Sequence, residues 1–131
     1  MREMKWFRFY NETIDDEKIH DIAQKENQPF PFVLGIWACL LTLASRSSQR
    51  GYLYIYGKKP YTVGKLSTKL KTNPTILDVL VKDFIDAEMI DLQGLVLHIT
   101  HWEDRQFESD NVAERVARYR MKKRNVTATN A

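Results

Sequence analysis

The sequence predicts a mainly helical α+β domain, on the strength of three observations. A strongly apolar run at residues 30–44 indicates a buried helix, apolar residues recur at helical spacing over residues 63–87, and Gly94 divides an apolar stretch into two halves of a hairpin. The chain has 131 residues, of which 44% are hydrophobic and 28% are charged. These values are those of a single folded module with one core.

Two short elements are expected before the apolar run. Residues 4–10 are rich in aromatic side chains that alternate loosely, which predicts an opening strand. Three consecutive acidic residues at 15–17 place negative charge where a helix N-terminus favours it, and apolar residues follow at helical spacing. A short amphipathic helix is therefore expected over residues 15–25.

The apolar run at residues 30–44 predicts the central helix. Its fifteen residues fall short of the ~20 that cross a bilayer, so no membrane span is expected. Apolar side chains cover all of its sides, so we expect burial on all sides, with a second face closed either by the core or by another subunit. Cys39, the single cysteine, is expected to be a buried, inert thiol.

Residues 51–56 alternate with period two, which predicts a short strand with Tyr52, Tyr54 and Tyr56 on one face. Such a tyrosine row fits a stacking platform for single-stranded DNA, but packing in the core or at a sheet edge is the favoured interpretation.

Two helices with clear start signals follow. Thr62 is the expected N-cap of a helix over residues 63–70, and Asn73 and Pro74 are the N-cap and first position of a helix that runs to about Ala87. On the second helix one face is apolar, and the opposite face is expected to carry Thr75, Asp78, Val79, Lys82, Asp83 and Asp86.

The hairpin is expected to turn at Gln93-Gly94. This register pairs Leu92 with Leu95 and Ile90 with Leu97 on a shared buried face. Beyond Trp102 the chain becomes polar, and residues 111–124 are typical of a helix with little apolar surface.

Helix, tight turn, amphipathic helix and short hairpin are, in this order, the parts of a winged helix-turn-helix with a β-hairpin wing, here over residues 62–99. We therefore expect a winged-helix domain over residues 1–110. Residues 111–131 are expected to form a basic C-terminal helix or linker.

Several short motifs also resemble one family, the N-terminal domain of phage replisome organiser proteins, relatives of the DnaD-like primosome proteins. The resemblance covers about residues 4–124 and lies in the order of weak motifs. They are Met4-Lys5-Trp6-Phe7, the helix at 32–44, Gly51-Tyr52-Leu53, Pro60-Tyr61-Thr62, the run at 84–90, Ile99-Thr100-His101-Trp102-Glu103 and the run at 115–120.

For that family the resemblance implies a winged-helix domain at the front of a longer protein, which binds the replication origin and helps to recruit the helicase machinery. The partners implied are double-stranded origin or single-stranded DNA and a replicative helicase or its loading proteins. A phage- or prophage-encoded protein acting in the cytoplasm of the bacterial host is expected, with a C-terminal domain after residue 131.

The charge pattern points to a polyanion as partner. Residues 46–71 hold seven bases and no acid, residues 72–91 hold one base against five acids, and residues 111–131 hold six bases and one acid. Basic zones of this kind suit nucleic acid, although they are often only solvated faces. The expected outer face of the second helix is rich in aspartate and would repel phosphate, so conventional base readout there is not expected.

DNA contacts are expected instead from two basic regions, mainly through phosphates. The first comprises Lys65, Lys69, Lys71, Asn73 and Thr75. The second is the C-terminal segment, with Arg115, Arg118, Tyr119, Arg120, Lys122, Lys123 and Arg124. A solvated linker helix is an equally weighted interpretation of that segment.

Two alternatives stay open. In one, the domain mainly assembles protein, through the apolar central helix or through an acidic face of Asp78, Asp83 and Asp86, and forms a homo-oligomer or meets a helicase component. In the other, it is a winged-helix transcriptional regulator. No phosphate-binding glycine loop, nucleophile motif or paired-cysteine metal motif occurs, so no enzyme, cofactor or metal is expected.

Overall fold

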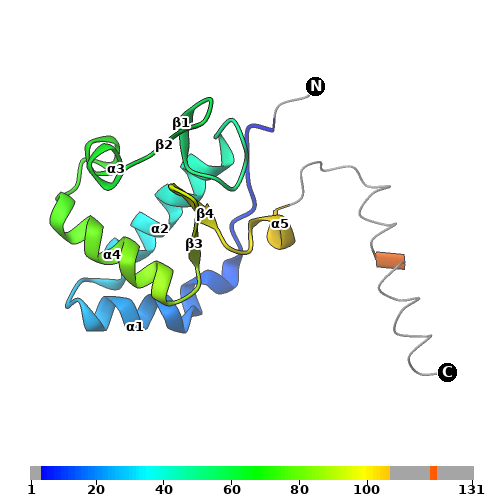
Figure 1. Cartoon of the computed structure of the whole chain (residues 1–131). Coiled ribbons are helices and arrows are strands. Elements are labelled where there is room, and N and C mark those ends of the chain that lie inside the picture. The colour runs from blue at the N-terminus through cyan, green and yellow to red at the C-terminus, as the bar shows by residue number, and fades with distance from the viewer. Residues whose placement is uncertain (1–3, 107–118, 121–131) are drawn as a thin grey trace.

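The computed structural model of this chain describes residues 4–106 and 119–120 (Figure 1). In this part, the elements in chain order are η1 (Asn11–Asp15), α1 (Glu17–Lys25), α2 (Phe30–Ser45), β1 (Tyr54–Tyr56), β2 (Lys59–Pro60), α3 (Val63–Leu70), α4 (Pro74–Asp86), β3 (Ile90–Gln93), β4 (Val96–Ile99) and α5 (Trp102–Arg105). The predicted mainly helical α+β class is confirmed.

The segment before η1 is not a strand, so that prediction is wrong. No neighbouring strand pairs with residues 4–10 in the described structure. The buried side chain of Gln106 takes the place of a partner strand at one point, because its Oε1 accepts from the backbone N–H of Arg8 and its Nε2 donates to the Arg8 carbonyl, both at 2.7 Å. The segment is thereby fastened to the end of α5.

The predicted helix at residues 15–25 is present as α1, which begins at Glu17, two residues later than predicted, and ends at Lys25. The Asp16 carboxylate accepts from the backbone N–H of Lys18 at 2.9 Å and of Ile19 at 3.3 Å, which makes Asp16 the N-cap. Its buried residues, Ile19, Ile22 and Ala23, pack against α2.

Helix α2 is the central helix but is not buried on all sides. Its core side is formed by Val33, Ile36, Leu40, Leu41, Leu43 and Ala44. Residues at positions 31, 35, 39 and 42 lie on one side of the helix and are exposed. This strip includes Cys39, so the prediction of a buried thiol is wrong. The strip carries Pro, Gly, Cys and Thr rather than large apolar side chains, which is why its exposure costs little.

Helices α3 and α4 have the predicted bounds and caps. Thr62 Oγ1 accepts from Lys65 N at 3.2 Å, and Asn73 Oδ1 accepts from Thr75 N at 2.7 Å and Ile76 N at 3.3 Å. Between the helices, Lys71 adopts the left-handed conformation (φ 55°) that ends α3. The two helices pack through a common core that includes the buried Leu66, Leu77, Leu80, Val81 and Phe84.

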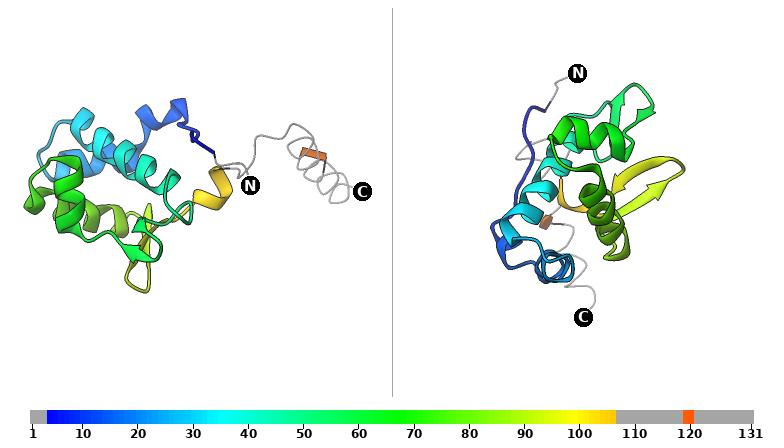
Figure 2. Two further views of the ribbon diagram at one scale, coloured as in Figure 1. Left: turned by 90° about the horizontal axis from the view of Figure 1, so that it is seen from above. Right: turned by 90° about the vertical axis from the view of Figure 1, so that its left-hand side faces the viewer.

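The β3–β4 hairpin exists, but its predicted register is wrong. Leu92 pairs with Leu97 and Ile90 with Ile99, so the turn lies at Gly94-Leu95. Gly94 has a φ of +67° and occupies the first central position of the turn, where a two-residue type II′ turn favours glycine. Leu92 and Leu95 are exposed, at 57% and 88%. The hairpin projects from the helical body in both views of Figure 2.

The predicted strand at residues 51–56 divides between two partners. Residues 51–53 run beside β4, since Leu53 N donates to Leu97 O and Ile99 N donates to Gly51 O, both at 2.8 Å. Residues 54–56 instead form β1 and pair with β2. Strand β4 therefore has a neighbour on each side, and all four of its residues are buried.

Candidate nucleic-acid interface

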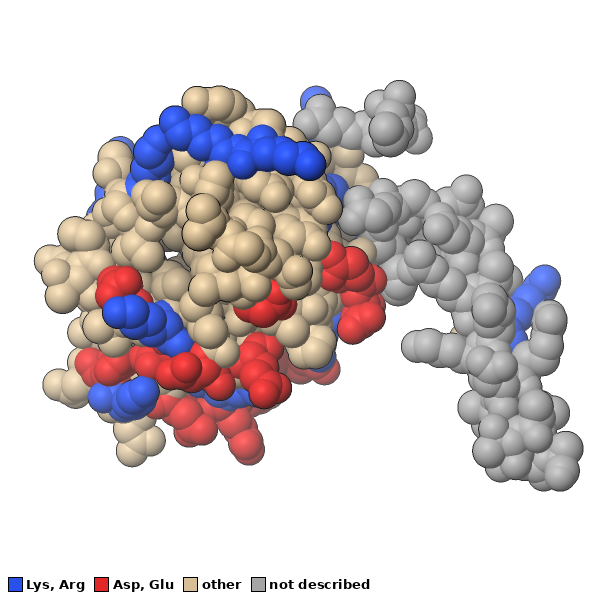
Figure 3. All heavy atoms as spheres, in the orientation of Figure 1, with Lys and Arg blue, Asp and Glu red and all other residues tan. Residues whose placement is uncertain are grey.

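Positive and negative side chains occupy different sides of the molecule. In Figure 3 a continuous ridge of Lys and Arg crosses the top, over β1–β2 and α3, whereas Asp and Glu gather lower down, over α1 and α4. The described lysines at residues 58–71 are all exposed, and within the described part of the chain none is ion-paired with a carboxylate. We call this set the basic ridge: Lys58, Lys59, Lys65, Lys69 and Lys71.

Two ammonium groups of the basic ridge repel each other. The side chains of Lys59 and Lys65 interact directly, and this contact lowers the pKa of Lys65. Lys59 Nζ donates to Tyr56 Oη at 3.3 Å. A bound anion would relieve the repulsion, so the site suits a phosphate.

The structure brings the first predicted group of DNA contacts together. Lys65 and Lys69 lie on the exposed side of α3, Lys71 forms the turn, and Asn73 and Thr75 open α4, so the five residues follow one edge of the helix pair. All five are exposed. Because Asn73 Oδ1 caps α4, its Nδ2 is the part of the amide left to donate to a ligand.

The predicted acidic face of α4 is not a single surface. Asp78 is ion-paired with Lys82 at 2.9 Å, and Asp86 is exposed. Asp83 is only 7% exposed, and its carboxylate lies 2.9 Å from Lys25 Nζ on α1. The prediction that Asp83 points away from the core is therefore wrong.

Asp83 is buried because α1 ends against that side of α4. The hydrogen bond from Lys25 to Asp83 raises the pKa of Lys25. The interaction with the Asp83 carboxylate, assisted by burial, raises the pKa of the neighbouring Glu26 carboxyl. The three groups join two helices within the domain.

Comparison with known protein families identifies the family of this chain. The model of the N-terminal phage replisome organiser matches residues 6–127. The chain belongs to this family. No curated protein and no solved structure matches it. Membership implies a role in phage DNA replication and makes this an organiser domain of a generally non-catalytic kind. None of the helices described for the organiser domain is long and apolar enough to cross a membrane.

Most of the second predicted group of DNA contacts lies outside the described residues of the organiser domain. Arg115, Arg118, Lys122, Lys123 and Arg124 belong to that part. Tyr119 and Arg120 are described and both are exposed, Tyr119 to 65%.

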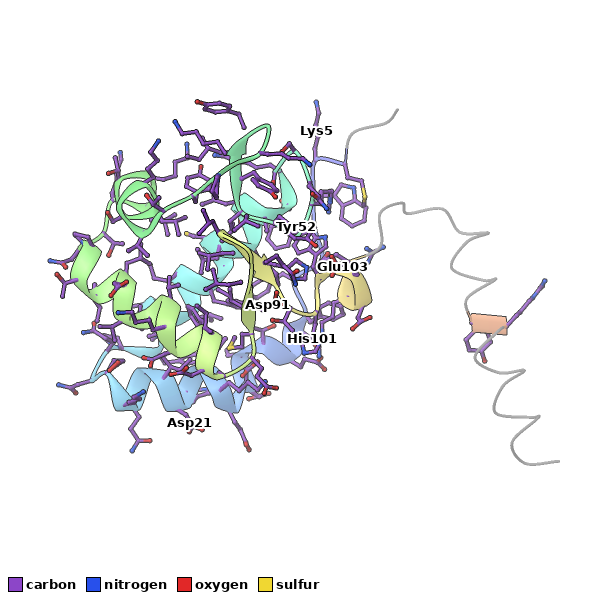
Figure 4. All side chains as sticks on the ribbon, in the orientation of Figure 1. Lys5, Asp21, Tyr52, Asp91, His101 and Glu103 are labelled. Atoms are coloured by element: carbon purple, nitrogen blue, oxygen red, sulfur yellow. The ribbon has the colours of Figure 1, made fainter. Side chains whose placement is uncertain are left out.

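Sequence reasoning missed a histidine cluster at the base of the β3–β4 hairpin. His98 is buried between two carboxylates, with Nδ1 at 3.1 Å from Asp91 and Nε2 at 3.0 Å from Glu103, and its ring lies 4.4 Å from that of Tyr52. In Figure 4, Tyr52, Asp91 and Glu103 lie close to this hairpin. Burial lowers the pKa of His98, but the hydrogen bonds to Glu103 and Asp91 outweigh it, so the pKa is raised. The cluster ties the 51–53 segment, the hairpin and α5 together.

The sequence could have predicted this cluster only with the correct register of the β3–β4 hairpin. Asp91 is the cross-strand partner of His98 only when the turn lies at Gly94-Leu95. The predicted contacts also omit the lysine pair at residues 58–59, although it lies close to Tyr56 in the same acid-free stretch.

Proposed function

We propose that the domain is a winged helix-turn-helix that binds DNA mainly through phosphate contacts along the α3–α4 edge and thereby helps to assemble the phage primosome in the cytoplasm of the bacterial host. The observation that carries this proposal is the basic ridge, whose ammonium groups are exposed and face no carboxylate in the described part of the chain. Phosphate is the ligand that such a surface attracts most strongly.

The order of elements supports the winged-helix assignment. Helix α2, the 51–53 segment, α3, α4 and the β3–β4 hairpin follow one another, and the 51–53 segment extends the hairpin to a third strand. A core helix, a helix-turn-helix and a projecting hairpin are the parts that this fold requires.

Base readout by α4 is not part of the proposal. Its outer face offers Asp78 and Asp86, and Lys82 is engaged by Asp78. The tip of the β3–β4 hairpin, residues 93–96, carries no cation. A domain built in this way would bind duplexes with little sequence preference.

Salt dependence tests this proposal. We would titrate a labelled duplex with the chain and follow fluorescence anisotropy across a salt series, comparing the unchanged chain with a Lys65→Ala, Lys69→Ala, Lys71→Ala variant. If all three lysines bind phosphates, their loss makes the negative slope of log K against log salt shallower by about 2.7. Lys82→Ala is the matched control, since it removes an exposed lysine outside the ridge. An unchanged slope in the triple variant would remove the α3–α4 edge from the interface.

The C-terminal segment is proposed as a second phosphate-binding region. If about five of its cations met phosphates, they would contribute about −4.5 to the same slope. A version ending at Asp110 tests this directly. Binding that survives the truncation with an unchanged slope would restrict the interface to the basic ridge.

The separation of charge favours a second role. The side of α1 and α4 on which acidic residues gather is positioned away from the basic ridge, and Asp78 and Asp86 belong to α4. We propose it as a docking surface for a basic partner protein, such as a helicase or helicase-loading component, or for a second copy. Cross-linking of an Asp78→Lys, Asp86→Lys variant to purified helicase components tests it, and undiminished cross-linking would exclude this surface.

A further inference from the structure

Tyr56 stands apart from the other tyrosines of its row. Tyr52 packs on His98 at 4.4 Å between ring centroids and stacks with Tyr54 at 6.1 Å. Both are half-buried, whereas Tyr56 is 64% exposed at the end of β1. The favoured interpretation of the row as packing therefore holds for Tyr52 and Tyr54 but not for Tyr56. A large aromatic ring is left presented to solvent.

The hairpin that presents Tyr56 is held in place. Tyr56 pairs with Lys59 across a turn formed by Gly57 and Lys58, in which Gly57 has a φ of +50°. The Ser48 hydroxyl, from the segment after α2, donates to the Gly57 carbonyl. An anchored turn lowers the entropy lost when its side chains bind a ligand.

Cations surround the Tyr56 ring. Lys59 Nζ lies 5.4 Å from the ring centroid and donates to the hydroxyl group. Lys58 follows directly in the exposed turn, and the Lys65 side chain interacts with that of Lys59. These ammonium groups face no carboxylate in the described part of the chain. An exposed aromatic ring beside such cations is the arrangement that binds single-stranded nucleic acid, because bases stack on the ring while the cations contact the backbone.

We propose that the β1–β2 hairpin binds unpaired DNA, with Tyr56 stacking on a base and Lys58, Lys59 and Lys65 binding the adjacent phosphates. This inference rests on the proposed DNA-binding function and adds a separate element to it. In an intact duplex the base faces are covered by their neighbours, so the contribution of Tyr56 is specific to a single strand.

The test compares single-stranded and duplex DNA binding by Tyr56→Ala and Tyr56→Phe. The probe is a fluorescein-labelled oligothymidine of about 12 nucleotides, within the range of about 4–16 nucleotides that single OB folds cover when they bind single strands. We expect Tyr56→Ala to weaken binding of the single strand about tenfold, as loss of one stacked base does, and to leave duplex binding within about twofold. Tyr56→Phe keeps the ring and should bind the single strand within about twofold of the unchanged chain.

Leu95→Ala is the control, because it removes an exposed apolar side chain from the tip of the other hairpin. Urea unfolding of each variant verifies that the fold is retained. A direct readout comes from 2-aminopurine placed in the oligonucleotide, whose fluorescence is quenched on stacking and should stay unquenched with Tyr56→Ala.

The outcomes separate this inference from the proposed function. Unchanged single-strand binding by Tyr56→Ala, or an equal loss for single strand and duplex, would overturn the stacking role while the Lys65, Lys69, Lys71 variant still tests the α3–α4 edge. Absence of any DNA binding by the unchanged chain at low salt would overturn both.

Discussion

Gly51 lies directly against the indole ring of Trp102. A Cβ atom at position 51 would lie 2.7 Å from Trp102 Cγ, and Gly51 also has a φ of +94°, where side chains are rarely accommodated. Trp102 is 1% exposed, and the guanidinium of Arg50 lies 5.4 Å from its ring centroid. This contact lets α5 dock on the chain just after α2.

Gly51→Ala should therefore destabilise the domain strongly. The left-handed backbone costs about 1–2 kcal/mol for a residue with a side chain, and overpacking against the buried indole adds about 1–3 kcal/mol. Urea unfolding followed by tryptophan fluorescence measures the total loss of unfolding free energy. Gly94→Ala is the matched control, since its φ is +67° but nothing lies within 4 Å of the added methyl group. Equal losses in the two variants would show that the indole contact contributes nothing.

The elements that the sequence predicted well are those that depend on near neighbours. Thr62 and Asn73 cap their helices through hydrogen bonds that span two or three residues, so their positions determine where α3 and α4 begin. The burial of Asp83 depends on where α1 ends in space, so the sequence of α4 alone could not predict it. The observed hairpin register differs from the predicted one because the pattern of apolar residues fits two turn positions. Burial of β4 on both faces removes the alternation that would distinguish them.

The His98 cluster should make stability depend on pH. The pKa of His98 is raised above 6.5 because Glu103 and Asp91 bond to the ring despite its burial, so the stabilisation is complete below 6.5 and is lost as pH rises through the raised pKa. The pKa of Asp91 is lowered below 3.8, against the effect of burial, by its bonds to His98 and Gln93, so its contribution is lost in acid. The cluster therefore stabilises the folded state most between pH 3.8 and pH 6.5.

Urea unfolding of the unchanged chain and His98→Gln at about pH 5.5 and about pH 8.5 tests this dependence. The difference in unfolding free energy between the two proteins should be larger at the lower pH. Proton NMR titration should give a His98 pKa above 6.5, and Asp91→Asn should bring it down. An equal difference at both pH values would contradict the raised pKa.

Cys39 should react with a thiol reagent in the folded protein. Its side chain belongs to the exposed strip of α2, so no unfolding is needed for access. Ellman's reagent should label the chain completely without denaturant, at a rate close to that in urea. Labelling only after addition of urea would indicate that another surface, such as a second copy, covers the strip.

The basic surface that we propose binds DNA could be predicted from the sequence in kind, but its exact position could not. The acid-free stretch of residues 46–71 predicted a basic surface, and the structure gathers its lysines into the basic ridge. Alternation alone could not show which tyrosine of the row is exposed. The strand divides after Leu53, where the chain leaves β4 and pairs with β2 instead. That division buries part of the row and exposes Tyr56.

Substitutions of Asn73 should separate its structural role from its proposed role on DNA. Asn73→Ala removes the N-cap of α4 and should cost about 1 kcal/mol of stability. Asn73→Asp keeps the cap, since aspartate caps helices as well as asparagine does, but it replaces the free amide donor with negative charge at the α3–α4 edge. Stability should then be nearly unchanged, while duplex affinity falls about fivefold, as repulsion of about 1 kcal/mol between a carboxylate and a nearby phosphate in water implies.

Fluorescence anisotropy measures the duplex affinity of each Asn73 variant, and urea unfolding measures its stability on the same samples. Unchanged affinity in Asn73→Asp would place the phosphates away from the start of α4.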